Sequence, residues 1–327
     1  MSDFHSIFRD DINNYLAIRK TVLSDSTIKH DTGYLASFDT FLVNIGIKEK
    51  VITETVLNAW QKTLTGKSSS KAGKIIAIRT FIKYLRSLGI SAYIPIIPKI
   101  YENYIPYIFS DEDLDRIFSA ADSNLFTKGQ PNPYMKAELP MILRILYGCG
   151  LRIGETLALQ MKDTDLKNGI LTLIHAKNKK HRLVPMSLLL SEILRRYCLA
   201  MGLIGSPDAH LFPNVASTGP ISIRSVRNRF DVILKNLGIK LPNKNWHERG
   251  PCQHCLRHVF VFKSFVKAQK NGRNIDDSIP FLSIYLGHDS LRETEKYLKF
   301  SSELFPNALE LFENYAGTVF PEADYEK

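Results

Sequence analysis

A segment interrupted by prolines divides this chain into two parts. Residues 93–109, YIPIIPKIYENYIPYIF, contain Pro95, Pro98 and Pro106. Each proline removes a backbone donor and blocks a helix, so the segment favours an extended linker. Ser110 and the acidic residues after it are typical of the start of a new helix. We therefore predict a helical domain at 1–95, a linker at 96–109, a second domain at 110–300 and a tail at 301–327.

The charge balance indicates an anionic partner. The 327 residues leave room for two domains, and the formal net charge is +10. Nucleic acid is the commonest partner of such a chain, although a merely basic enzyme is an open alternative. Four cysteines do not make a disulfide scaffold, and neither a signal peptide nor a membrane span is evident. We expect a cytoplasmic protein without a membrane partner.

The first part contains a one-sided basic helix. The segment Gly66–Gly89 has six basic residues and no acidic one. Ile75, Ile78, Ile82 and Leu85 recur at helical spacing and predict its buried face. An exposed face usually mixes charges, whereas a purely basic stripe suits a phosphate backbone. The residues expected to contact DNA here are Lys71, Lys74, Arg79, Lys83 and Arg86.

The second part mixes helices with two strands. Residues 170–176 and 182–186 alternate like strands and are joined by a basic turn. Lys179, Lys180 and Arg182 in this hairpin are further candidates for DNA contact. The predicted helices cover 139–147, 153–159, 187–201, 222–237, 255–269, 282–286 and 290–297.

Four short motifs in the second part can carry chemistry. They are Arg152 in GLRIGE, the basic hairpin before RLVP, the His254-x-x-Arg257 pair, and LGH followed by Tyr297 nine residues after its histidine. Each alone has an ordinary explanation, such as a surface arginine, a solvated turn or a partly buried tyrosine.

Together, in this order, the motifs resemble the tyrosine recombinase, or phage integrase, family. The resemblance covers residues 108–300, and the first 90 residues resemble the family's helical DNA-clamping domain in pattern only. It implies a mainly α fold with a small antiparallel β-sheet (α+β). The catalytic residues that it implies are Arg152, Lys177, His254, Arg257, His288 and the nucleophile Tyr297, supported by Glu155. Lys179 and Lys180 are close rivals of Lys177.

The chemistry implied is transesterification at a DNA phosphodiester without a metal or cofactor. Arg152 and Arg257 would clamp the non-bridging oxygens. Tyr297 would attack the phosphorus and form a 3′-phosphotyrosyl bond. His254 would accept its proton, Lys177 would protonate the leaving 5′-oxygen, and His288 would hydrogen-bond the phosphate.

The resemblance also implies partners. It predicts a site-specific recombinase that works as a homotetramer on double-stranded DNA, and it allows sister recombinases. The polar insertion KAQKNGRNIDDS and the tail resemble recombinases of transposons and other mobile elements. Two alternatives stay open: a type IB topoisomerase, and a DNA-binding accessory protein without catalysis.

A cluster of sulfur and imidazole side chains offers a competing interpretation. Cys252, His254, Cys255 and His258 lie close together in sequence, and His247 could complete a zinc site. No second Cys-x-x-Cys pair exists, so we favour phosphate as the ligand of His254. Cys252, Cys255 and His258 are then expected to be packed side chains.

Overall fold

The computed structural model describes residues 3–100, 107–123, 132–174, 181–240, 250–295 and 297. It divides into two compact units, Met1–Tyr104 and Ile105–Lys327. The division falls inside the proline-containing segment. Lys177, Lys179, Lys180 and the predicted tail lie outside the described residues. The described part is mostly helical with a small antiparallel sheet, which confirms the predicted fold class.

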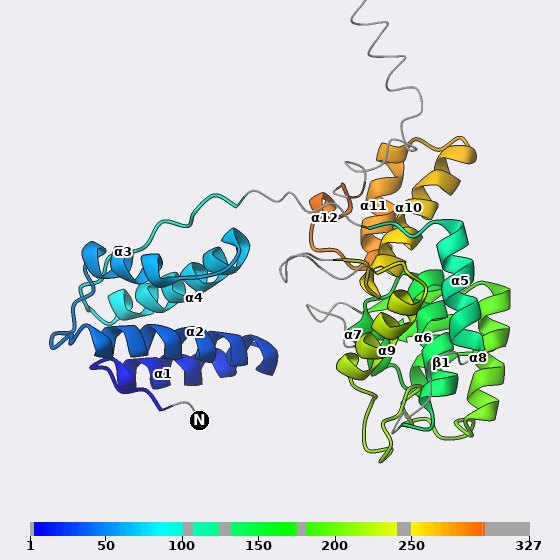
Figure 1. The fold of residues 1–327 in the computed structure, drawn as a ribbon, viewed down its shortest axis with the longest axis horizontal. Coiled ribbons are helices and arrows are strands. Elements are labelled where there is room, and N and C mark those ends of the chain that lie inside the picture. Colours follow the sequence, from blue (N-terminus) through cyan, green and yellow to red (C-terminus); the bar gives the residue numbers. More distant parts are fainter. Residues whose placement is uncertain are drawn as a thin grey trace, which may run out of the picture. The chain divides into compact units, whose positions relative to one another are not determined.

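Four helices build the first unit (Figure 1). They are α1 (Arg9–Lys20), α2 (Asp25–Asn44), α3 (Glu54–Thr63) and α4 (Ser68–Ser87). Ser24 and Thr53 start α2 and α3 because their hydroxyls accept the backbone N–H groups of Thr27 and Val56. Trp60 and Phe38 meet edge to face at the centre, with ring centroids 5.1 Å apart. The predicted face of α4 is buried as expected, with Ile75, Ile78, Ile82 and Leu85 in this core.

The second unit packs around α6. Helix α5 (Asp111–Asp122) begins where predicted, since the Ser110 hydroxyl accepts the N–H of Asp113. Helix α6 (Met135–Cys149) is buried on most of its surface and contacts α5, α8 (Leu188–Ala200) and α10 (His254–Lys270). The short α7 (Ile153–Ala158) and α9 (Ile223–Asn236) complete the group.

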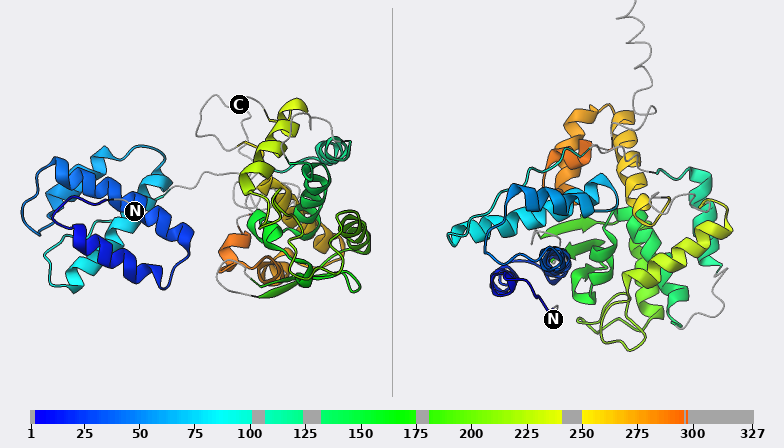
Figure 2. Two further views of the ribbon diagram at one scale, coloured as in Figure 1. Left: turned by 90° about the horizontal axis from the view of Figure 1, so that it is seen from below. Right: turned by 60° about the vertical axis from the view of Figure 1, so that its left-hand side comes forward.

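A three-stranded antiparallel sheet lies in the same unit, shown in green in Figure 2. Its order is β1 (Thr164–Asp165), β2 (Ile170–Leu173) and β3 (Arg182–Pro185), with the 3₁₀ turn η1 (Met161–Asp163) before it. Leu173 is paired with Arg182 and Ile170 with Pro185. The two predicted strands are therefore present and paired, and β1 is an addition that the sequence did not suggest.

The last helices differ from the expectation. Helix α11 covers Ile275–Leu286 rather than 282–286 alone, and α12 covers Leu291–Glu295. The last four residues of the polar insertion, 275–278, thus form the first turn of α11, and its first four, 267–270, end α10. Ile275 and Ile279, four residues apart, are buried with Val261 and Phe265 of α10, and this apolar contact holds the turns despite Pro280. Among the residues that the structure describes, no helix combines the length and apolar character that crossing a membrane requires.

Candidate active site

Arg152 is positioned by the turn between α6 and α7. Gly150 ends α6 with a φ of 61°, a conformation that favours glycine. A side chain there would also collide with Phe260, whose nearest ring carbon would lie 2.3 Å from the added Cβ. Beyond the turn, the Arg152 guanidinium donates to the carbonyl oxygens of Leu286 (3.4 Å) and Gly287 (3.3 Å). The first arginine of the motif set therefore reaches the LGH motif, far away in sequence.

Glu155 holds two arginines. Its carboxylate accepts the backbone N–H and Nη1 of Arg152, at 2.9 and 3.0 Å. It also accepts both terminal nitrogens of Arg182, at 3.1 and 2.8 Å. Burial pushes the pKa of Glu155 up, but the hydrogen bonds from Arg182 and Arg152 outweigh it, so the pKa lies below the ordinary value.

The placement of Arg182 differs from its expected role in DNA contact. Its side chain is only 9% exposed and is turned inward from β3 onto Glu155. The guanidinium also lies under Gly287, where an added Cβ would come within 2.8 Å of Nη1. Paired and buried in this way, Arg182 belongs to the interior of the site rather than to an outer basic surface.

Arg257 lies at the centre and is 1% exposed. Its Nη1 donates to the Gly150 carbonyl (2.6 Å), and its Nη2 donates to the Leu286 carbonyl (3.1 Å) and to Nε2 of His288 (2.9 Å). Burial and the nearby charge of Arg152 lower the pKa of Arg257 to about 10. The guanidinium is therefore still charged at neutral pH.

His288 is held in one tautomer. Arginine can only donate, so Nε2 accepts from Arg257 and the proton sits on Nδ1, which donates to the Thr294 hydroxyl at 2.7 Å. Burial, followed by the charges of Arg257 and Arg152, lowers the pKa of His288 to about 3. The ring is therefore neutral at neutral pH.

Tyr297 follows α12 and faces this group. Its ring is parallel to the His288 ring within 2°, with centroids 6.5 Å apart. Burial raises the pKa of Tyr297, although the charge of Arg257 and a hydrogen bond from it act in the opposite direction. The phenol is thus protonated at neutral pH and must lose its proton before it can act as a nucleophile.

His258 lies between His254 and Tyr297 and was expected only to pack. Its ring centroid is 4.7 Å from that of His254 and 5.2 Å from that of Tyr297. His258 is buried as predicted, whereas His254, at the start of α10, is exposed. The i, i+4 spacing of the two histidines already placed them on one helix face. That spacing could have indicated that the ring of His258 lies at the site beside the ring of His254.

The basic residues proposed for DNA contact are placed unequally. On α4, Lys83 and Arg86 are exposed and Lys71 and Lys74 are half-buried. Arg79 is half-buried and donates to the Pro95 carbonyl within its own unit. Helix α9 adds exposed Arg224 and Arg227, which the sequence analysis did not select.

The cysteine-rich stretch has no third ligand in the described part of the chain. The Sγ atoms of Cys252 and Cys255 lie 3.9 Å apart, and both thiols are free. Within the described ranges, no group of three or more His, Cys, Asp or Glu side chains is arranged to hold a metal ion. His247, the further ligand considered for zinc, lies outside the described residues.

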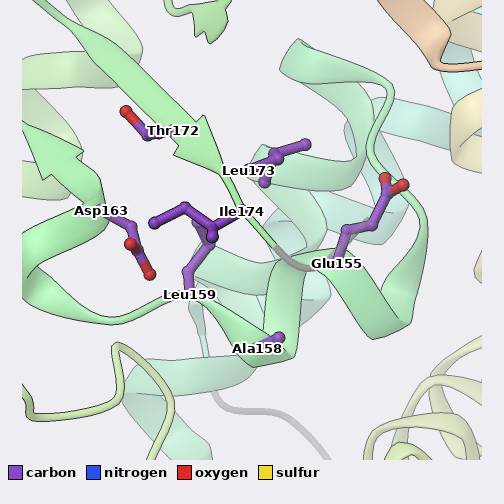
Figure 3. Close-up of a pocket in the computed structure, with 7 residues that line it drawn as sticks. All are labelled: Glu155, Ala158, Leu159, Asp163, Thr172, Leu173 and Ile174. Carbon is purple, nitrogen blue, oxygen red and sulfur yellow. The ribbon is translucent and has the colours of Figure 1, made fainter. Parts of the chain in front are cut away.

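A small pocket adjoins the site on the sheet side (Figure 3). Ala158, Leu159, Leu173 and Ile174 form its apolar lining between α7 and β2. Its carboxylates, Glu155 and Asp163, lie at opposite ends in the close-up. The Glu155 carboxylate is bound by Arg152 and Arg182 and is not free to bind a ligand. The pocket is therefore not a second polar site.

Solved structures share this fold. An XerH site-specific recombinase bound to a palindromic difH substrate matches 88% of this chain and 80% of its own, with a TM-score of 0.66 and 21% identity. The integrase of the Tn1549 transposon, in complex with a circular intermediate DNA, matches 93% and 98%, with a TM-score of 0.63 and 14% identity. At these identities the likeness concerns the fold, which is that of integrase-type enzymes.

Sequence comparison identifies the family. Residues 108–303 match the model of the phage integrase family. A putative integrase/recombinase of Sinorhizobium fredii, y4rB, is 27% identical over 94% of this chain and 98% of its own. The tyrosine recombinase XerC of Bacillus subtilis is 28% identical over 90% and 91%. The chain belongs to the phage integrase family. It is a tyrosine recombinase, an enzyme of site-specific recombination.

Proposed function

We propose that this recombinase cleaves and rejoins double-stranded DNA through a 3′-phosphotyrosyl intermediate. The observation that carries the proposal is the meeting of Arg152, Arg257, His288 and Tyr297. They come from four separate segments, and contacts of Arg257, Arg152 and Tyr297 all converge on Gly287 and His288. Two fixed positive charges beside a phenol are what attack on a phosphodiester requires.

The arginines would stabilise the charge that gathers on the non-bridging phosphate oxygens. Both side chains carry planar donor groups that suit a phosphate, and neighbouring carbonyls hold them in place before DNA arrives. Such preorganised charge contributes on the order of 3 kcal/mol per donor. The negative phosphate would also raise the pKa of His288, so that the ring could donate to an oxygen.

The reaction requires two proton transfers, one from the attacking Tyr297 and one to the leaving 5′-oxygen. His254 is the candidate acceptor for the Tyr297 proton, and His258, in ring contact with both, would hold them in register. Lys177 would protonate the 5′-oxygen that leaves. Glu155 would orient Arg152, and we assign Arg182 to the same positioning role.

The DNA would be gripped outside this centre. The exposed cations of α4 and α9, with Lys179 and Lys180, are the proposed phosphate contacts. We further propose a homotetramer on specific recombination sites, tails exchanged between protomers, and a role on a mobile element, where sister recombinases could take part. The DNA-bound transposon integrase of similar fold supports this role. Relatives named as recombinases favour strand exchange over topoisomerase activity or a purely accessory role.

A covalent-trapping experiment tests the proposal. Purified protein in EDTA is incubated with nicked duplexes from the DNA that flanks its gene, and the products are resolved under denaturing conditions. We expect a protein–DNA adduct that Tyr297→Phe abolishes while DNA affinity is retained. An adduct of equal yield in Tyr297→Phe would refute the assigned nucleophile, and intact binding without any adduct would refute self-sufficient cleavage.

A further inference from the structure

Cys252 and Cys255 form a dithiol at the N-terminal end of α10. The proposed chemistry does not use either thiol. Their Sγ atoms are 3.9 Å apart, and the Cys255 N–H donates to the Cys252 carbonyl at 2.9 Å, which closes the turn. Residues three apart in a helical turn have Cα atoms about 5 Å apart. This separation lies inside the range of about 4.4–6.8 Å that disulfides occupy.

The two sulfurs are inequivalent, as an attacking and a resolving thiol would be. Cys252 is half-buried, whereas Cys255 is fully buried beneath it. The hydrogen bond shared with Cys255 lowers the pKa of Cys252 to about 6, against the effect of burial, and it raises the pKa of Cys255. Cys149 and Cys198 are also fully buried, and burial raises their pKa values to about 12 and about 11. These two thiols should therefore stay inert.

We propose that Cys252 and Cys255 are a redox modification site whose disulfide switches off DNA cleavage. The Cys252 thiolate attacks one sulfur of a small-molecule disulfide and releases one small thiolate. The Cys255 thiol then loses its proton and attacks Cys252 Sγ, which expels the second small thiolate. Two protein thiols are thereby oxidised to one disulfide, and one small disulfide is reduced to two thiols.

Disulfide formation would disturb the proposed site because His254 lies between the two cysteines in the sequence. A disulfide requires an S–S distance of about 2.0 Å, so the two Sγ atoms must approach each other by about 2 Å, through rotation of both side chains and adjustment of the turn that carries them. His254 lies inside that turn, and Arg257 lies two residues beyond it. A displacement of about 1 Å in a catalytic group can cost about 100-fold in rate. The inference rests on the proposed function for this effect on cleavage, but not for disulfide formation.

The test uses the full chain with oxidised glutathione as the probe, in EDTA. Peptide mass analysis should show loss of two hydrogens, confined to a Cys252–Cys255 link, while Cys149 and Cys198 stay reduced and are alkylated once the protein is denatured. Covalent DNA adduct formation should fall at least about 10-fold on oxidation and return with dithiothreitol. Cys255→Ser and Cys252→Ala should be insensitive to oxidation, with Cys198→Ser as the matched control that keeps the response.

Two results would overturn the proposal. One is a mixed glutathione adduct, or no reaction, at Cys252 under conditions that oxidise a reference dithiol. The other is a complete intramolecular disulfide with unchanged cleavage. If the reduced enzyme forms no DNA adduct at all, the proposed function fails instead, and the mass analysis still decides whether the disulfide forms.

Discussion

Arg182 spans both carboxylate oxygens of Glu155, with Nη1 at 3.1 Å and Nη2 at 2.8 Å. This fork ties β3 to α7, the helix whose N-cap is Arg152. Both partners are largely buried. The pair therefore connects the sheet to the proposed phosphate clamp at Arg152.

Breaking this pair should destabilise the second unit. Arg182→Met leaves a buried carboxylate with one arginine instead of two, and we expect a loss of about 3 kcal/mol in the free energy of unfolding. Chemical denaturation measures it. Arg196→Met removes an exposed partner of Glu192 on α8 and should leave the midpoint unchanged. Equal losses in both variants would contradict a structural role for the Arg182 fork.

Gly287→Ala should reduce both stability and cleavage. Gly287 has a φ of 64°, and an added Cβ would lie 2.8 Å from Nη1 of Arg182. Gly272 offers a matched control because its φ is 74° and nothing lies within 4 Å of an added Cβ. Both variants should lose about 1 kcal/mol from backbone strain. Only Gly287→Ala should also lower the rate of adduct formation, and equal rates in the two variants would argue against the contact with Arg182.

Arg257→Lys should fail despite keeping the charge. Lysine cannot bond Gly150, Leu286 and His288 with one planar group. We expect adduct formation to fall by about 100- to 1000-fold. Single-turnover cleavage on nicked duplexes, with a parallel measurement of thermal stability, tests this. Near-normal cleavage would show that charge alone suffices.

Acid should weaken the second unit through its buried histidines. The pKa values of His258 and His288 fall from an ordinary 6.5 to about 3, chiefly because of burial. Between these values the unfolded chain binds more protons than the native one, so stability is lost as pH falls from about 6.5 towards 3. His258→Gln should reduce the slope of unfolding free energy against pH by about 1 kcal/mol per unit in this window. An unchanged slope would show that His258 does not carry this effect.

The resemblance of the ordered motifs to the tyrosine recombinase family was enough to predict which side chains meet, because each motif specifies both a residue type and its place in the chain. Arg152, Arg257, His288 and Tyr297 were selected in this way, and the structure brings them together. The buried face of α4 was equally predictable, since helical spacing alone selects its residues. The chemical roles of the four site residues remain predictions.

Side-chain contacts between residues far apart in the sequence could not be predicted from local sequence. Arg182 appeared as one more cation of a basic hairpin, because nothing local shows that β3 turns it towards Glu155, 27 residues away. The early start of α11 was missed because the residues before 282 include the end of the polar insertion, which shows no apolar stripe of helical spacing. Burial of Ile275 and Ile279 against α10 decides that conformation, and only the folded chain contains this contact.

The bonds of Arg257 give it a second duty. Its nitrogens bond the carbonyl of Gly150, which caps α6, and that of Leu286, which is the last residue of α11. The negative ends of two helices thus share one cation, which offsets the cost of burying it. Arg257 therefore has a structural role in addition to its proposed role at the phosphate. A cleavage-dead variant for capturing intact DNA complexes is therefore better made by removing the Tyr297 hydroxyl than by replacing this arginine.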